Sequence, residues 1–304
     1  MKRVLVISTL CCLFILKTTG VQANEAKQGI TVDPAFIEID LEEDEQEETF
    51  EFGFQNNNKE SVIIELFTLN FRHKDETGLV QFIGDDTTSY EYSLVSYISV
   101  PVDSIRVAPG EKEVVPVTVK NRLDLSPGGH YAGIIGRITS DKDSAQNTKV
   151  RPSVASLILL RKRGGEQFNL SLKEVDWPSR IVHFFYTDKI SLMFQNEGNI
   201  HLVPRGTVEI RDILGRVIYK GVINTSSFYV LPSSKRRLTI TMNKTLRALP
   251  ISIDTLTVKG NDSLKKTRFT FQDSYIHIHP IVIFILIVAS GLTFAYSKRK
   301  WSKR

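Results

Sequence analysis

The fold is decided by residues 50–58, which have the sequence FEFGFQNNN. Phe50, Phe52 and Phe54 occupy alternate positions, and this period of two is typical of a strand with one buried face and one solvated face. The three asparagines favour a turn directly after the strand. The segment 37–41 alternates in the same way. The sequence therefore predicts two half-buried strands near the start of an antiparallel sheet.

Short apolar segments of the same kind recur between residues 24 and 277. In the first half we expect further strands at 62–71, 93–100, 113–120, 131–139 and 154–161. In the second half we expect strands at 168–175, 181–194, 208–213, 217–222, 237–242, 251–259 and 267–271. Turn sequences rich in Asn, Pro and Gly separate many of them. This spacing predicts an all-β protein with two immunoglobulin-like antiparallel β-sandwiches, and Pro116 marks its strand as an edge or a bulge.

Charge divides the predicted ectodomain at a short polar hinge, residues 163–166. Residues 24–150 contain 24 acidic and 11 basic residues, whereas residues 151–277 contain 10 acidic and 20 basic residues. We therefore expect an acidic sandwich at 24–163 and a basic sandwich at 164–275. Two interpretations stay open. The charges keep each domain soluble, or the basic domain lies beside anionic lipid headgroups or wall polymers.

The N-terminus has the features of a secretory signal peptide. Lys2 and Arg3 precede an apolar segment, and small residues suit a cleavage site between Ala23 and Asn24. Residues 1–23 are then removed, and an uncleaved anchor is the alternative. Both cysteines lie at 11 and 12, so cleavage leaves a mature chain without thiol, disulfide or Cys-based zinc chemistry.

A second apolar segment lies near the C-terminus. No charged residue occurs between Asp273 and Lys298, so residues 276–297 are long enough to cross a membrane as a helix. The tail 298–304 contains five basic residues and predicts a cytoplasmic stop, which places the N-terminal ectodomain outside a cell membrane. A buried core helix is the alternative interpretation.

The sequence contains no motif of a catalytic, nucleotide-binding or nucleic-acid-binding site. We therefore predict a non-enzymatic protein with no cofactor, no bound metal and no nucleic-acid partner. His277 and His279 lack a third ligand nearby, and a juxtamembrane spacer explains them better than a metal site. The segment 126–133 is the most distinctive of the first domain. It predicts a turn that leads into a strand, and alternatively His130 and Tyr131 form a ligand-binding edge.

The chain resembles the WxL-interacting proteins of Gram-positive bacterial surfaces. The resemblance rests on the opening 30–35, the strand ending at Asn56, the turn 108–110 and the segment 127–131. It implies a peptidoglycan-binding immunoglobulin-like domain, a second immunoglobulin-like domain and a C-terminal membrane anchor. The resemblance does not identify any individual ligand-binding residue in this chain.

Three functions are compatible with these features. The first is a membrane-anchored surface protein that binds cell-wall polymer, a surface protein, or both. The second is a membrane-tethered immunoglobulin-like chaperone of secreted β-rich subunits, with the strand of Pro116 as its docking edge. The third is an enzyme with dispersed carboxylates. The anchor and the absence of catalytic motifs favour the first.

Overall fold

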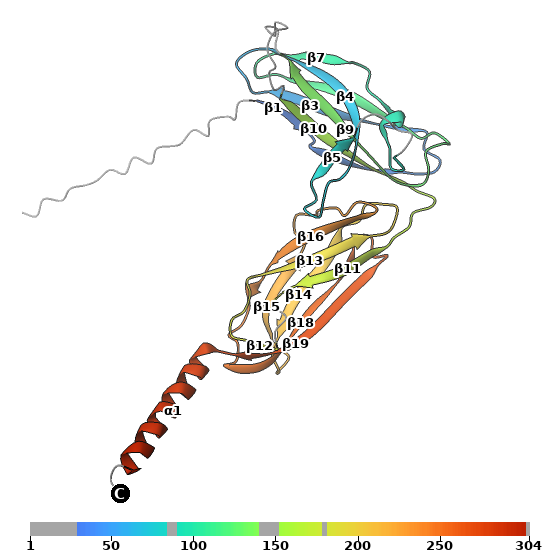
Figure 1. Ribbon diagram of the computed structural model, residues 1–304. Coiled ribbons are helices and arrows are strands. Elements are labelled where there is room, and N and C mark those ends of the chain that lie inside the picture. Colours follow the sequence, from blue (N-terminus) through green and yellow to red (C-terminus); the bar gives the residue numbers. More distant parts are fainter. Residues whose placement is uncertain (1–28, 84–89, 140–151, 178–180, 302–304) are drawn as a thin grey trace, which may run out of the picture.

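The computed structural model describes residues 29–83, 90–139, 152–177 and 181–301 (Figure 1). Two β-sandwiches follow one another along the chain, and helix α1 (Pro280–Trp301) extends from the far end of the second. The predicted fold class is confirmed: two immunoglobulin-like sandwiches precede one C-terminal helix. The predicted signal peptide, its cleavage site between Ala23 and Asn24, and residues 302–304 of the tail lie outside the described residues.

The first sandwich is built from two antiparallel sheets with one parallel pair. One sheet has the order β1-β3-β8-β6, and the other has the order β2-β10-β9-β4-β5 with β7 paired to β4. The bounds are β1 (Ile30–Asp33), β2 (Phe36–Leu41), β3 (Glu47–Asn56), β4 (Val62–His73), β5 (Val80–Ile83), β6 (Ile98–Ser99), β7 (Ser104–Val107), β8 (Lys112–Lys120), β9 (Gly128–Thr139) and β10 (Ser153–Lys162). Strands β2 and β10 run parallel.

The alternation at 50–58 places side chains as expected. Phe52 and Phe54 are fully buried between the sheets, whereas Glu51 is exposed, and the Asn56 side-chain Oδ1 accepts a hydrogen bond from the Asn58 N–H in the following turn. Pro116 lies opposite Glu51 of β3, and β6 pairs only with residues 118–119 of β8. The proline therefore occupies a stretch of β8 whose other side has no described strand, as its missing N–H requires.

The second sandwich has a three-stranded sheet, β11-β13-β16, and a six-stranded sheet, β12-β19-β18-β14-β15-β17. The bounds are β11 (Leu170–Asp176), β12 (Val182–His183), β13 (Lys189–Asn196), β14 (Pro204–Arg211), β15 (Val217–Ile223), β16 (Ser234–Thr241), β17 (Asn243–Lys244), β18 (Ile251–Asp262) and β19 (Arg268–Ile278). A separate apolar cluster that includes Phe194, Leu256 and Val258 forms its core.

Several expected boundaries are wrong. The strand expected at 181–194 is interrupted, because β12 joins one sheet and β13 joins the other. The strand expected at 93–100 is interrupted by a short 3-10 helix (Val95–Tyr97), and only β6 follows as a strand. Strands β1, β5 and β7 were not expected, since four residues are too few to show a clear period.

The helix begins four residues later than the expected start at 276. Ile276 and His277 continue β19, where they pair with β12 on one side and with β18 on the other. Ile276 and His277 therefore belong to the sheet and not to the helix. At its other end the helix continues through residues 298–301, which we had placed in the tail.

Candidate binding site between the two sandwiches

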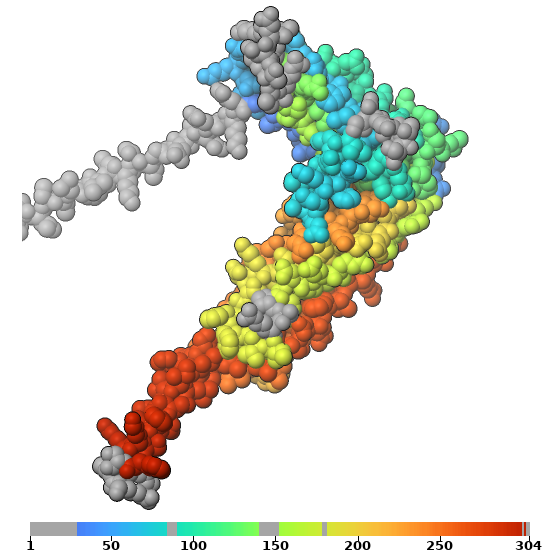
Figure 2. All heavy atoms as spheres, in the orientation of Figure 1, coloured from blue at the N-terminus to red at the C-terminus, as the bar shows by residue number. Residues whose placement is uncertain are grey.

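The outer face of the β10-β9-β4 sheet is unusually apolar for a surface of a sandwich. Ala132 and Ile134 of β9 face the core between the two sheets. Tyr131 lies on the outer face of its sheet, where other residues cover it completely. It packs in a second cluster with Phe71, Leu159 and, from the second sandwich, Leu231. A sheet that is apolar on both faces needs cover on both. The second sandwich supplies part of that cover (Figure 2).

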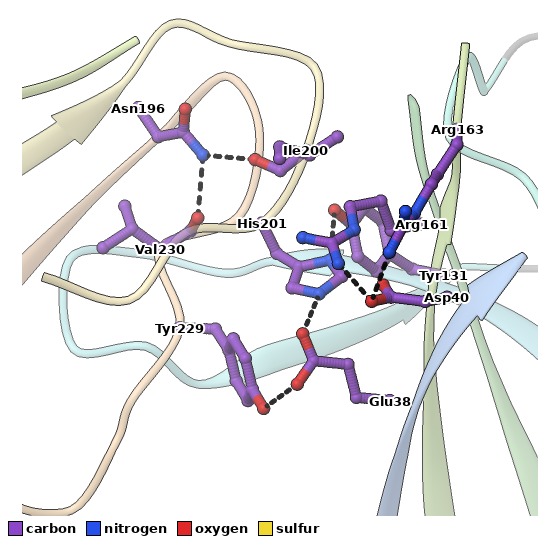
Figure 3. Close-up of polar contacts among 10 residues, drawn as sticks. All are labelled: Glu38, Asp40, Tyr131, Arg161, Arg163, Asn196, Ile200, His201, Tyr229 and Val230. Carbon is purple, nitrogen blue, oxygen red and sulfur yellow. Dashed lines mark hydrogen bonds and ion pairs between the residues drawn. The ribbon is translucent and has the colours of Figure 1, made fainter. Parts of the chain in front are cut away.

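A polar network centred on the buried His201 side chain fixes the two sandwiches to each other (Figure 3). The His201 Nε2 of the second sandwich lies 2.9 Å from Glu38 Oε1 of β2, and the Tyr229 hydroxyl donates to Glu38 Oε2 at 2.9 Å. On the other side of the imidazole, the Tyr131 hydroxyl lies 3.2 Å from His201 Nδ1. The His201 side chain is only 2% exposed. Both ring nitrogens of His201 therefore contact side chains of the first sandwich.

The electrostatics of this network favour a charged Glu38. Its hydrogen bond to His201 lowers the pKa of the Glu38 carboxyl, with a further contribution from the Tyr229 hydroxyl. Burial, and then the Glu38 carboxylate, raise the pKa of Tyr229 to about 12, so this phenol stays a donor. Arg161 pairs with Asp40 on the neighbouring strands, beside the network. Glu38 is therefore a carboxylate held by the His201 ring and the Tyr229 hydroxyl.

Backbone contacts reinforce the network at two further points. The Gly129 N–H donates to the Asn199 carbonyl at 2.7 Å, and the Arg237 N–H donates to the Glu76 carbonyl in the turn between β4 and β5 at 2.7 Å. In that turn Gly78 has a φ of +83°, and a Cβ there would overlap the Arg236 guanidinium. We call these contacts and the Glu38–His201–Tyr229 network the interdomain joint.

A cleft of about 410 Å³ opens beside the interdomain joint, and both sandwiches line it. Its apolar side chains include Phe36, Leu79 and Phe228, which are 53%, 59% and 48% exposed. The Arg236 guanidinium lies 4.4 Å from the Phe228 ring centroid and donates to the Tyr229 carbonyl at 2.7 Å. Its Nε is buried without a partner. This interdomain cleft offers a ligand apolar surface, the cations Lys235 and Arg236, and the carboxylate of Asp75.

The structure buries both residues that we selected as a possible ligand-binding edge. His130 is 3% exposed, and its ring nitrogens lie 3.0 Å and 2.8 Å from the carbonyls of Ser93 and Ser126. Tyr131 faces His201 in the interdomain joint. Neither side chain lies on the surface in this conformation, and ligand binding by them stays a prediction.

The residues that build the joint and the cleft escaped the sequence analysis. Glu38 and His201 are 163 residues apart, and nothing in either local sequence indicates a partner. The one available signal was the run of buried residues in β9, where the expected alternation of apolar and polar side chains is missing. Within the described ranges, no group of three or more His, Cys, Asp or Glu side chains is placed to hold a metal ion.

Comparison with known proteins gives likeness to solved structures alone. No family model and no curated protein matches the sequence. The class 5 fimbriae chaperone CfaA is 10% identical, covers 81% of this chain and 99% of its own, and has a TM-score of 0.43. The E. coli chaperone DraB is 12% identical over 80% of this chain and 98% of its own, with a TM-score of 0.37. Identity and TM-scores at this level are too low to transfer a function.

Proposed function

We propose that this chain is a non-enzymatic, membrane-anchored cell-surface protein that binds a protein partner in the interdomain cleft. One observation carries the proposal: two sandwiches held by the interdomain joint together line an open, largely apolar cleft. A cleft between fixed domains presents a preformed surface, which reduces the entropy lost on binding. The exposed Phe36, Leu79 and Phe228 suit apolar side chains of a polypeptide better than the hydroxyls of a wall polymer.

The membrane anchor of the proposal rests on α1. Residues 280–299 have a mean hydropathy of 2.1, and none of the most apolar window is buried against the sandwiches. A helix of this length can cross the hydrocarbon core of a bilayer. The basic residues after it favour a cytoplasmic C-terminus, so both sandwiches lie outside the cell.

A charge placed in the cleft tests the proposal. We expect Leu79→Asp to weaken partner binding by about tenfold or more, because a buried carboxylate would replace an apolar contact. Val114→Asp is the matched control, since Val114 is 46% exposed but lies on β8 of the opposite sheet. Binding to purified cell wall is measured alongside. Equal losses in the two variants, or retention by wall polymer with no protein partner, would contradict the proposal.

A second candidate is a membrane-tethered chaperone of secreted β-rich subunits, and the edge of β10 favours it. Strand β2 pairs with β10 only from Leu157 to Lys162, so residues 153–156 have a described strand neighbour on one side only. An extended client strand can add to such an edge. The stretch of β8 around Pro116, which also has a described strand on one side only, stays a predicted docking edge beside β10. A secreted subunit that aggregates in cells lacking this protein would favour the chaperone.

A further inference from the structure

A second cavity, of about 590 Å³, lies at the other end of the second sandwich, where α1 begins. Its wall is formed by the loop after β12, the segment 244–250, the end of β19 and the first residues of the helix. The His279 N–H donates to the Pro250 carbonyl at 2.7 Å, which ties the start of the helix to the sandwich. Figure 1 shows α1 leaving the molecule from this end. We call this the foot cavity.

His277 is a buried side chain that faces the foot cavity without a hydrogen-bond partner. It is 1% exposed, and both its ring nitrogens lack a partner. Its ring stacks on Tyr186 with 4.2 Å between the ring centroids, and the Tyr186 hydroxyl donates to Asp254 Oδ2 at 2.6 Å. Buried polar atoms almost always have a hydrogen-bond partner, so the two ring nitrogens are available to a ligand or to water.

The charge of the foot cavity selects an anion. Lys244 and Arg247 are exposed residues of its wall, and His279 lies beside them. No acidic side chain is among the residues that line the cavity. The Asp254 carboxylate, which accepts from the Tyr186 hydroxyl through Oδ2 and has no described partner at Oδ1, is fully buried outside this lining. Burial lowers the pKa of His277, which leaves a neutral ring able to donate from one nitrogen. Two cations and an imidazole form a binding set for a phosphate.

The exposed apolar side chains around the foot cavity favour a lipid headgroup as the phosphate-containing ligand. Phe185 and Ile181 are 76% and 80% exposed at the same end of the sandwich, and Phe184 is 44% exposed. Aromatic side chains next to the end of an apolar helix are typical of the membrane–water interface. If α1 spans the membrane, as proposed above, the foot cavity lies at the level of the outer headgroups.

We infer that the foot cavity binds the headgroup of an anionic phospholipid. Lys244 and Arg247 hold the phosphate, His277 donates a hydrogen bond to the headgroup, and the acyl chains lie along α1 beside Phe185. The lipid fixes the sandwiches relative to the bilayer. This site is at the opposite end of the second sandwich from the interdomain cleft, so its failure and the failure of partner binding are separable.

The test uses the full chain, delipidated in detergent, with phosphatidylglycerol, phosphatidylcholine and inorganic phosphate as separate probes in native mass spectrometry. We expect phosphatidylglycerol to bind in preference to the other two. Lys244→Ala with Arg247→Ala should weaken it roughly thirtyfold, since each cation near an anionic lipid contributes about 1 kcal/mol. His277→Phe, which keeps the stacking on Tyr186, should weaken it severalfold.

The control variant removes two charges from the other end of the same domain, Lys259→Ala with Arg268→Ala. Both residues are exposed strand positions distant from the foot cavity. It should bind phosphatidylglycerol as the unchanged protein does. Equal binding of phosphatidylcholine, or an equal loss in the control, would overturn the inference. Inorganic phosphate binding as tightly as the lipid would overturn the lipid assignment.

Discussion

Removal of a single oxygen, in Tyr131→Phe, tests the interdomain joint. The hydroxyl lies 3.2 Å from His201 Nδ1 inside a buried site, and the ring packs in the cluster that contains Phe71 and Leu231. The substitution keeps the ring and its packing. It leaves the His201 Nδ1 without a partner, at a cost of about 1–3 kcal/mol for a buried polar atom.

Urea unfolding of the full chain in detergent measures this cost, with Trp177 fluorescence as the signal in a Trp301→Phe background. We expect a lower midpoint at an unchanged slope, equivalent to about 1–3 kcal/mol. Tyr97→Phe is the control, because the Tyr97 hydroxyl donates to the Asp124 carbonyl at an exposed site. That variant should change the free energy of unfolding by about 0.5 kcal/mol or less.

The double variant Tyr131→Phe with His201→Leu separates the hydrogen bond from the packing. Deleting both partners removes the orphaned nitrogen, so the two single effects should not add, and the coupling should be about 0.5–3 kcal/mol. Additive effects, or a Tyr131→Phe variant as stable as Tyr97→Phe, would refute the argument that this hydrogen bond holds the sandwiches together.

Two further predictions concern the same joint. The pKa of Glu38 is lowered in the folded chain, so the stabilisation of the fold by its carboxylate is complete above the usual pKa of 4.5 and is lost as the pH falls through the folded pKa. Glu38→Gln should therefore flatten the acid side of the curve of unfolding free energy against pH. Gly78→Ala should loosen the joint more than Gly110→Ala, as measured by urea midpoint: both positions have positive φ, but only at Gly78 does a Cβ meet a neighbour, the Arg236 guanidinium.

The sequence predicted the fold well because its signals are local. The period of two at 50–58 and the turn asparagines determine a strand and its end without reference to the rest of the chain. The predicted strand and helix boundaries were wrong where the pairing of neighbouring strands determines them. Ile276 and His277 lie in a stretch with no Asp, Glu, Lys or Arg that could belong to the helix, yet they pair as strand residues because β12 and β18 lie beside them. Hydrophobicity alone cannot distinguish these two outcomes.

The candidate site was much less accessible from the sequence. Segment 126–133 stood out by its glycines, and the structure places Gly129 and Tyr131 in the interdomain joint. Their partners Asn199 and His201 come from the connection between β13 and β14 of the other sandwich, and a single sequence gives no measure of contacts between domains. The foot cavity depends in the same way on segments 184–186, 244–250 and 277–281 meeting in space.

Site-specific photocrosslinking on living cells tests the central claim, that a protein partner occupies the interdomain cleft. A photoreactive phenylalanine analogue is placed at Leu79 or, as the control, at Val114. The account predicts that the analogue at Leu79 links to one protein, identified by its cross-linked peptide, and that Leu79→Asp weakens the binding of that purified protein by about tenfold or more. Cross-links to the same protein from Val114, or none from Leu79, would contradict the account.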